Sequence, residues 1–283
     1  MPTNLETTEG VSRRASLLEQ YGLVTPDHTI KLPSNGWLYP KYDDGRFIDA
    51  ISVRGLTIKE MKWLPGGDAG SASLLNRLLA AIIIPPQEGW PQAMTTERVV
   101  RQLVDGDVPS VLLAMRICTF GLEFKAPMKC WSCEHVYTRD IDLATEVDIK
   151  HLTKQPDSDG NFSFSDNAVF NGAEVRFKLL TLEDEEAISN SIEERKKRGL
   201  ATDNDASLER FAKAVLSIGS LKDKGDIKFL LGQMPLSMLD KFSEKLKEVD
   251  FGPYLDNIAV SCPKCGTKDT VSVPLALVVL SRQ

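Results

Sequence analysis

Two cysteine pairs with identical spacing stand out in this sequence because their chemistry is easiest to interpret. Cys130 and Cys133 lie three positions apart in "MKCWSCEHVY", and Cys262 and Cys265 do the same in "SCPKCGTKD". Four thiolates in the order CxxC…CxxC are a ligand set of tetrahedral zinc sites. Gly266, directly after the second pair, suits a tight turn that needs a positive φ. The pattern predicts one zinc ion per chain, which is structural because four protein ligands close its shell.

Other interpretations of these cysteines are weaker. A haem attachment site needs His after the second cysteine, where this chain has Glu134. A redox CxxC normally opens a helix, whereas the alternating segments around both pairs predict β-hairpins. A thiol oxidoreductase and two unrelated buried pairs remain alternatives. Cys118 lies in an apolar helical stretch and is interpreted as a buried small hydrophobe, and His135 is a further potential ligand.

Composition narrows the class of protein. The chain has 283 residues, of which 42% are hydrophobic and 26% charged, as in ordinary globular proteins, and its net charge is −6. An acidic chain is a poor starting point for nucleic-acid binding. We expect no secretory signal and no membrane span, since the apolar stretch at 78–84 stops at Pro85. Five cysteines in a reducing cytoplasm argue against a disulfide framework.

The predicted fold class is α+β. We expect mostly helical lobes with strands, and two CxxC β-hairpins that form a split zinc ribbon. Residues 1–28 are interpreted as an N-terminal arm with one short amphipathic helix at 11–23. Residues 29–145 are predicted to form a first lobe with the first hairpin, and residues 146–283 a second lobe with the second hairpin.

The two lobes have similar patterns. In each, a strand leads into a capped helix, a later helix opens near a proline, and a CxxC hairpin follows. The residues that carry this likeness are Thr57 with Glu60, Thr181 with Asp184, Pro109 and Pro235. Asp107 is expected to cap the helix that contains Pro109. An internal duplication would explain the 128 residues between Cys133 and Cys262, because the gap is then a second copy of the lobe.

Several segments, taken in order, resemble the baseplate hub and hub-assembly family of T-even-like contractile-tailed phages. In the first half these are "LPSNGWLYP", "GLTIKEMKWL", "LLNRLLAAII" and "DGDVPSVLLAMRICTFGLEFKAPMKCWSCEHVYTRDIDL". In the second half they are "RFKLLTLEDEEAI", "FLLGQMPLSMLDKF" and "VSCPKCGTKDTVSVPL". The resemblance covers roughly residues 29–280, and the segments 64–71 and 85–95 look like loop insertions.

The resemblance implies a structural component of the tail baseplate, at or near the hub, without catalytic activity. It implies a virion protein made in the host cytoplasm, whose partners are other tail and baseplate proteins of the same phage. The alternative within the family is an assembly factor that leaves the finished baseplate. The aromatic opening Trp37-Leu38-Tyr39 is interpreted either as an exposed docking segment or as a local cover over the core.

The runner-up class is a zinc-ribbon module that binds nucleic acid. Such a module needs basic residues beside the knuckles, and this chain has Lys125, Lys129, Arg139, Lys264 and Lys268 there. Four acids dilute that charge: Glu134, Asp140, Asp142 and Asp269. We therefore expect no nucleic-acid partner, no membrane and no small-molecule substrate.

Overall fold

The structure is a computed structural model, and it describes residues 20–21, 23, 26–60, 72–199 and 205–280. Most of the expected N-terminal arm, with its helix at 11–23, and the insertion at 64–71 lie outside the described residues. Helices and small antiparallel sheets alternate along the chain, so the predicted α+β class is confirmed. Within the described ranges, no helix is long and apolar enough to cross a membrane.

The first half builds a three-stranded antiparallel sheet, three helices and a long hairpin. The sheet has the order β1-β2-β3, and β3 follows directly on the helix α2. Val53 in the central strand is fully buried and lies opposite His28 and Ile83. The elements are β1 (Asp27–Lys31), β2 (Ala50–Arg54), α2 (Ala72–Ile82), β3 (Ile83–Ile84), η2 (Pro91–Ala93), α3 (Thr96–Gln102), α4 (Val108–Phe120), β4 (Glu123–Lys129) and β5 (Val136–Asp142).

The second half again begins with a three-stranded antiparallel sheet, in the order β7-β8-β9. Here β9 follows directly on the helix α6, and two further helices lead to the second hairpin. The elements are β6 (Asp148–Lys150), β7 (Phe162–Phe164), η3 (Phe170–Gly172), β8 (Val175–Phe177), α5 (Leu182–Lys197), α6 (Asp205–Ala214), β9 (Val215–Ile218), α7 (Lys224–Gly232), α8 (Leu236–Lys247), β10 (Gly252–Tyr254), β11 (Ile258–Ser261), β12 (Lys268–Val271) and α9 (Leu275–Leu280).

The likeness between the halves extends to the caps. Thr181 and Asp184 form the predicted capping box at the start of α5. The Glu60 carboxylate likewise accepts hydrogen bonds from the backbone N–H and hydroxyl of Thr57. Residues 58–60 form a turn, and the rest of the helix expected there lies outside the described residues. Thr95 caps α3 and Asp223 caps α7, each by a side-chain bond to a backbone N–H three residues on. This shared order is what an internal duplication predicts.

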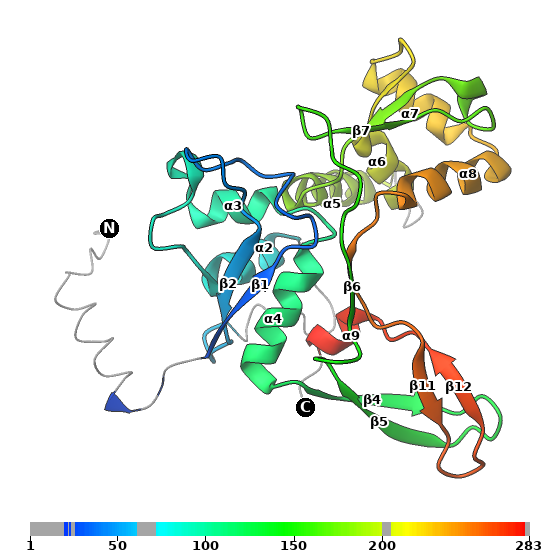
Figure 1. Cartoon of the computed structure of the whole chain (residues 1–283). Coiled ribbons are helices and arrows are strands. Elements are labelled where there is room, and N and C mark those ends of the chain that lie inside the picture. The colour runs from blue at the N-terminus through cyan, green and yellow to red at the C-terminus, as the bar shows by residue number, and fades with distance from the viewer. Residues whose placement is uncertain (1–19, 22, 24–25, 61–71, 200–204, 281–283) are drawn as a thin grey trace.

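Three sizeable apolar clusters hold the fold. The largest surrounds the first sheet and helices α2 to α4, and it also takes in residues of the second half. A second cluster lies among β7 to β9 and α6 to α8. A third joins the end of α4 and α9 to the two hairpins. In Figure 1 the hairpins project together at one end, and β6 runs between them and the second sheet. The lobe boundary near residue 145 stays a prediction.

Candidate metal centre

The four predicted cysteines come together between the tips of the two hairpins (Figure 1). All four Sγ atoms lie within 4.8 Å of one another. Two pairs join the halves, with 3.7 Å between Cys130 and Cys265 and 3.6 Å between Cys133 and Cys262. These distances are far longer than a disulfide bond of about 2.05 Å, and all four cysteines are free thiols.

Each CxxC pair sits in a knuckle of the same geometry. The backbone N–H of Cys130 donates to the carbonyl of His135, and that of Glu134 donates back to the carbonyl of Cys130, both at 2.9 Å. In the second knuckle the backbone N–H of Cys262 donates to the carbonyl of Thr267, and that of Gly266 donates back to the carbonyl of Cys262, again at 2.9 Å.

The residue after the second cysteine has a positive φ in both knuckles, 56° at Glu134 and 71° at Gly266. From the sequence, a positive φ could be predicted only at Gly266, because glycine adopts that conformation without steric cost.

The sulfur positions fit a tetrahedral ion. Four ligands at about 2.3 Å from a central zinc would place neighbouring sulfurs about 3.8 Å apart. The two Sγ–Sγ distances between the halves, 3.6 and 3.7 Å, are near that value. Cys130 and Cys262 are buried, Cys133 is half-buried and Cys265 is exposed, so the cluster lies at the surface end of the ribbon. The set of four ligands fills a tetrahedral shell and leaves no position for a substrate.

The electrostatics of the cluster favour a bound cation. Hydrogen bonds from the hydroxyl and the N–H of Thr267 lower the pKa of Cys265 to about 6. At Cys133 the N–H of His135 acts in the same direction, but desolvation and the neighbouring thiols outweigh it and raise the pKa to about 12. One thiolate forms easily, while further thiolates beside it are costly. A divalent cation would remove that cost.

A buried arginine holds the base of the ribbon together. Arg116, on α4, is 1% exposed. Its guanidinium donates to the carbonyls of Val278, Gly121 and Glu123, each at 3.3 Å. These bonds join α9 to the point where α4 ends and β4 begins. The third apolar cluster packs around the same junction, so the base of the two hairpins is also held by contacts that do not involve the cysteines.

The other two sequence candidates lie outside the cluster. Cys118, on α4, has its Sγ 3.8 Å from the carbonyl oxygen of Val53, and burial raises the pKa of its thiol. Cys118 is half-buried against the main apolar cluster, and not fully buried as the sequence predicted. The ring of His135 stacks on Tyr137 with 6.3 Å between centroids, and His135 is not one of the clustered ligands.

The structure corrects the cap expected at Asp107, and it shows how the aromatic opening at residues 37–39 packs. Asp107 precedes α4 but makes no side-chain cap; its carboxylate is fully buried and accepts bonds from the Tyr39 hydroxyl at 2.5 Å and the Ser34 N–H at 3.0 Å. Tyr39 is 6% exposed, and Trp37 and Leu38 pack on the core. The structure therefore favours the interpretation of this aromatic opening as a local cover over the core. In its buried position the Asp107 carboxylate is the acceptor for two donors, the Tyr39 hydroxyl and the Ser34 N–H.

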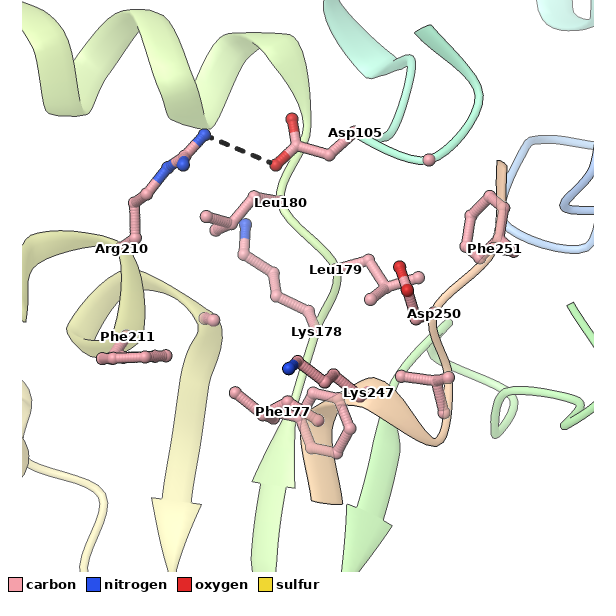
Figure 2. Close-up of a pocket in the computed structure, with 14 residues that line it drawn as sticks. Asp105, Phe177, Lys178, Leu179, Leu180, Arg210, Phe211, Lys247, Asp250 and Phe251 are labelled. Atoms are coloured by element: carbon pink, nitrogen blue, oxygen red, sulfur yellow. Dashed lines mark ion pairs between the residues drawn. The ribbon is translucent and has the colours of Figure 1, made fainter. Parts of the chain in front are cut away.

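A separate hollow of about 370 Å³ lies at the joint between the halves (Figure 2). Arg210 points across it to Asp105, at 3.8 Å, and also binds Glu185 at 2.8 Å. Desolvation raises the pKa of Asp105 to about 7, and Glu185 adds to the rise. The Asp105 side chain is nevertheless 47% exposed, so solvent weakens the effect. The walls are mainly apolar, with Leu180 and Phe251 facing the opening.

Comparison with known proteins gives one match. A family model described as "T4 bacteriophage base plate protein" matches residues 91–276, about two thirds of the chain. No curated protein and no solved structure matches the chain. The matched region runs from η2 to the start of α9 and contains both hairpins with all four clustered cysteines.

Proposed function

The chain belongs to the T4 bacteriophage base plate protein family, and from that premise we propose that it is a structural protein at or next to the hub of a contractile-tail baseplate. It acts by binding other tail and baseplate proteins of the same phage and carries no catalytic activity. The family match carries the baseplate assignment. The hub position rests on the ordered resemblance of the sequence segments that begin with "LPSNGWLYP".

The cysteine cluster is proposed to hold one structural zinc ion through Cys130, Cys133, Cys262 and Cys265. The ion would neutralise the thiolates and cross-link two hairpins that are far apart in sequence. The Sγ–Sγ distances of 3.6 and 3.7 Å support zinc geometry. The chain itself supplies the two knuckles and, through Arg116, the rigid base on which they stand.

Protein binding is favoured over nucleic-acid binding by the charges on the ribbon. Lys129 pairs with Glu134 at 3.7 Å, and Arg139 pairs with Glu146 at 2.8 Å. The ribbon has four acids, Glu134, Asp140, Asp142 and Asp269, among its five cations, and its small net positive charge is a poor match for a phosphate backbone. A salt-dependent mobility shift of DNA by the purified protein would reverse this preference.

The test of the proposal is quantitative mass spectrometry of purified phage tails. The protein should be present at a small, fixed ratio to other baseplate proteins, and it should remain after loosely bound host proteins are washed away. The same peptides are measured in lysates of infected cells as the matched sample. A protein that is abundant in the lysate but missing from finished tails would be an assembly factor instead.

A further inference from the structure

A groove of about 360 Å³ lies between α5, α6 and α7 in the second half of the chain. In Figure 1 α6 and α7 lie at the end of the molecule away from the ribbon, and α5 lies between them and the helices α2 and α3. The apolar lining of the groove consists of the buried side chains of Ile188 and Ala212 and the exposed Ala187. Three lysines from two helices stand around it: Lys213, Lys224 and Lys228. The groove therefore combines a short aliphatic surface with a cationic rim.

The carboxylates beside the groove are already shared between cations. Asp184, which is 6% exposed, accepts Lys178 at 2.6 Å and Lys213 at 3.4 Å.

Glu209 accepts both Arg195 and Lys228. Lys224 donates to the carbonyl oxygen of Val215 at 2.5 Å. Among the described residues that line the groove, three lysines outnumber the single carboxylate of Glu209, so the groove keeps an excess of positive charge.

The pKa of Lys224 reflects both burial and this excess of positive charge. Desolvation lowers the pKa of Lys224, and the charges of Lys178 and Lys213 lower it further. The chain as a whole has a net charge of −6, so the groove is a positive region on an acidic protein. Such a region attracts anionic groups and gives them a preferred orientation.

We propose that this groove binds an acidic peptide segment of a neighbouring baseplate protein. The inference rests on the proposed function and adds to it the chemistry of one partner. Carboxylates of the segment pair with Lys213, Lys224 and Lys228, and an aliphatic side chain between them covers Ile188. Pairing relieves the mutual repulsion of the lysines, and burial of the aliphatic group adds to affinity.

The lining favours a peptide over a nucleic acid. Single-stranded nucleic acids bind where aromatic rings stack on the bases along a continuous basic track. Among the described residues that line this groove there is no aromatic side chain, and Glu209 lies within it. The hollow is short, so it accommodates a few side chains and not a length of backbone phosphates. Carboxylates on flexible aliphatic stems match both its apolar lining and its rim.

The experiment measures binding of a short fluorescein-labelled peptide of Glu, Ala and Leu to the full chain by fluorescence anisotropy. The double variant Lys213→Gln/Lys224→Gln removes two rim charges. Lys241→Gln/Lys245→Gln on α8 is the matched control, because it removes the same charge from lysines outside the groove. The groove variant should bind about tenfold more weakly, and the control should change by less than about twofold.

Two further samples sharpen the result. Lys224→Arg keeps the charge and should retain binding, and a peptide with Gln in place of Glu should not bind. Equal weakening by both double variants would show that only bulk charge matters and would overturn the inference. Tighter binding of single-stranded DNA, lost in the groove variant, would replace the peptide by a nucleic acid.

The absence of any peptide binding at physiological salt would also overturn it. Circular dichroism checks that each variant is folded. A protein that is present in tails but does not bind the peptide keeps its baseplate role and loses this inference. A protein that binds the peptide but is missing from tails loses only the virion assignment.

Discussion

The two halves of the chain share an order of elements but bury their apolar residues differently. The second half forms a cluster entirely from residues between Phe164 and Leu246. The main cluster of the first half also needs residues from beyond the first hairpin. Those residues are Leu152, Phe162, Phe177, Leu182, Val249, Phe251 and Val279. A repeated order of elements therefore does not make the two halves equally independent.

The centres of the halves differ as well. On α8, the fully buried Phe242 contacts the rings of Phe164, Phe170 and Phe211 edge to face. At the start of the corresponding helix α4, the buried group is the Asp107 carboxylate with its hydrogen bonds. An aromatic cluster depends on packing, whereas a buried carboxylate depends on keeping all its donors. The five predictions that follow test these differences, from the largest effect to the smallest.

The largest effect is expected from loss of the proposed zinc ion, which would cross-link the hairpins of the two halves. Cys262→Ser should lower zinc content and the melting temperature together, because structural zinc in small fingers binds with an apparent ~10–16 kcal/mol. Part of the fold should survive on its apolar clusters. Elemental analysis measures the zinc content, and free-thiol counting measures the state of the cysteines. Hydrogen exchange measures local stability, and faster exchange is expected in β4, β5, β11 and β12.

Cys118→Ser is the matched control and should leave about one zinc per chain. Zinc binding should weaken as the pH falls, because the ligands must be thiolates. A metal-free protein with an unchanged melting temperature, or two CxxC disulfides, would return the cysteines to redox chemistry.

The next largest effect is expected in the aromatic centre of the second half. Phe242→Ala should lower the free energy of unfolding by about 3–5 kcal/mol, since it removes a fully buried ring and leaves a cavity. Hydrogen exchange should become faster in α7 and α8 and change little in α3 and α4. Equal acceleration in both halves would show that the second cluster is not independent.

In the first half, Asp107→Asn should destabilise by about 1–3 kcal/mol. The amide replaces one acceptor oxygen with a donor, so either the Tyr39 hydroxyl or the Ser34 N–H loses its partner. Chemical denaturation measures the change. Tyr39→Phe tests the same network from the other side, and additive losses in the double variant would contradict a coupled network.

The joint between the halves is tested by Gly106→Ala. A methyl group there would lie 2.5–2.8 Å from ring atoms of Phe251, so this buried ring must shift within the core. We expect a loss of about 1–3 kcal/mol in the free energy of unfolding. Gly232→Ala at the end of α7 is the control, because its methyl meets only Leu208 at 3.6 Å. A neutral Gly106→Ala would mean that the halves are loosely joined.

The smallest effect concerns Asp105 at the same joint. Its pKa is about 7 in the fold against an ordinary value of 3.8, so the folded chain binds this proton more tightly than the unfolded chain. The contribution to stability therefore falls as the pH rises from about 4 to about 7.

Asp105→Asn removes that dependence, and its melting temperature relative to wild type should rise over the same interval. The change should be below about 1 kcal/mol, because the side chain is 47% exposed. Asp240→Asn, an exposed change on α8, should give a flat difference.

Local features were predictable from the sequence because they depend on neighbouring residues. The spacing of Cys130 and Cys133 sets a knuckle, and Thr181 with Asp184 sets a cap, whatever the rest of the chain does. The α+β class followed from similar local patterns. Glu134 shows where local prediction from the sequence ends. Its positive φ could not be predicted from the residue type, and it becomes clear only when the first knuckle is compared with the second, where Gly266 holds the same position.

What the sequence by itself determined is therefore the two cysteine knuckles, the order of elements that the halves share and the family. Only the tertiary structure decided that Asp107 faces Tyr39 instead of capping α4. It also decided that Lys178, Lys213 and Lys224 converge, although they come from different elements. The physical reason is the range of the interactions. Turn and cap geometry is set within a few residues, whereas burial and charge clustering depend on which distant segments pack together.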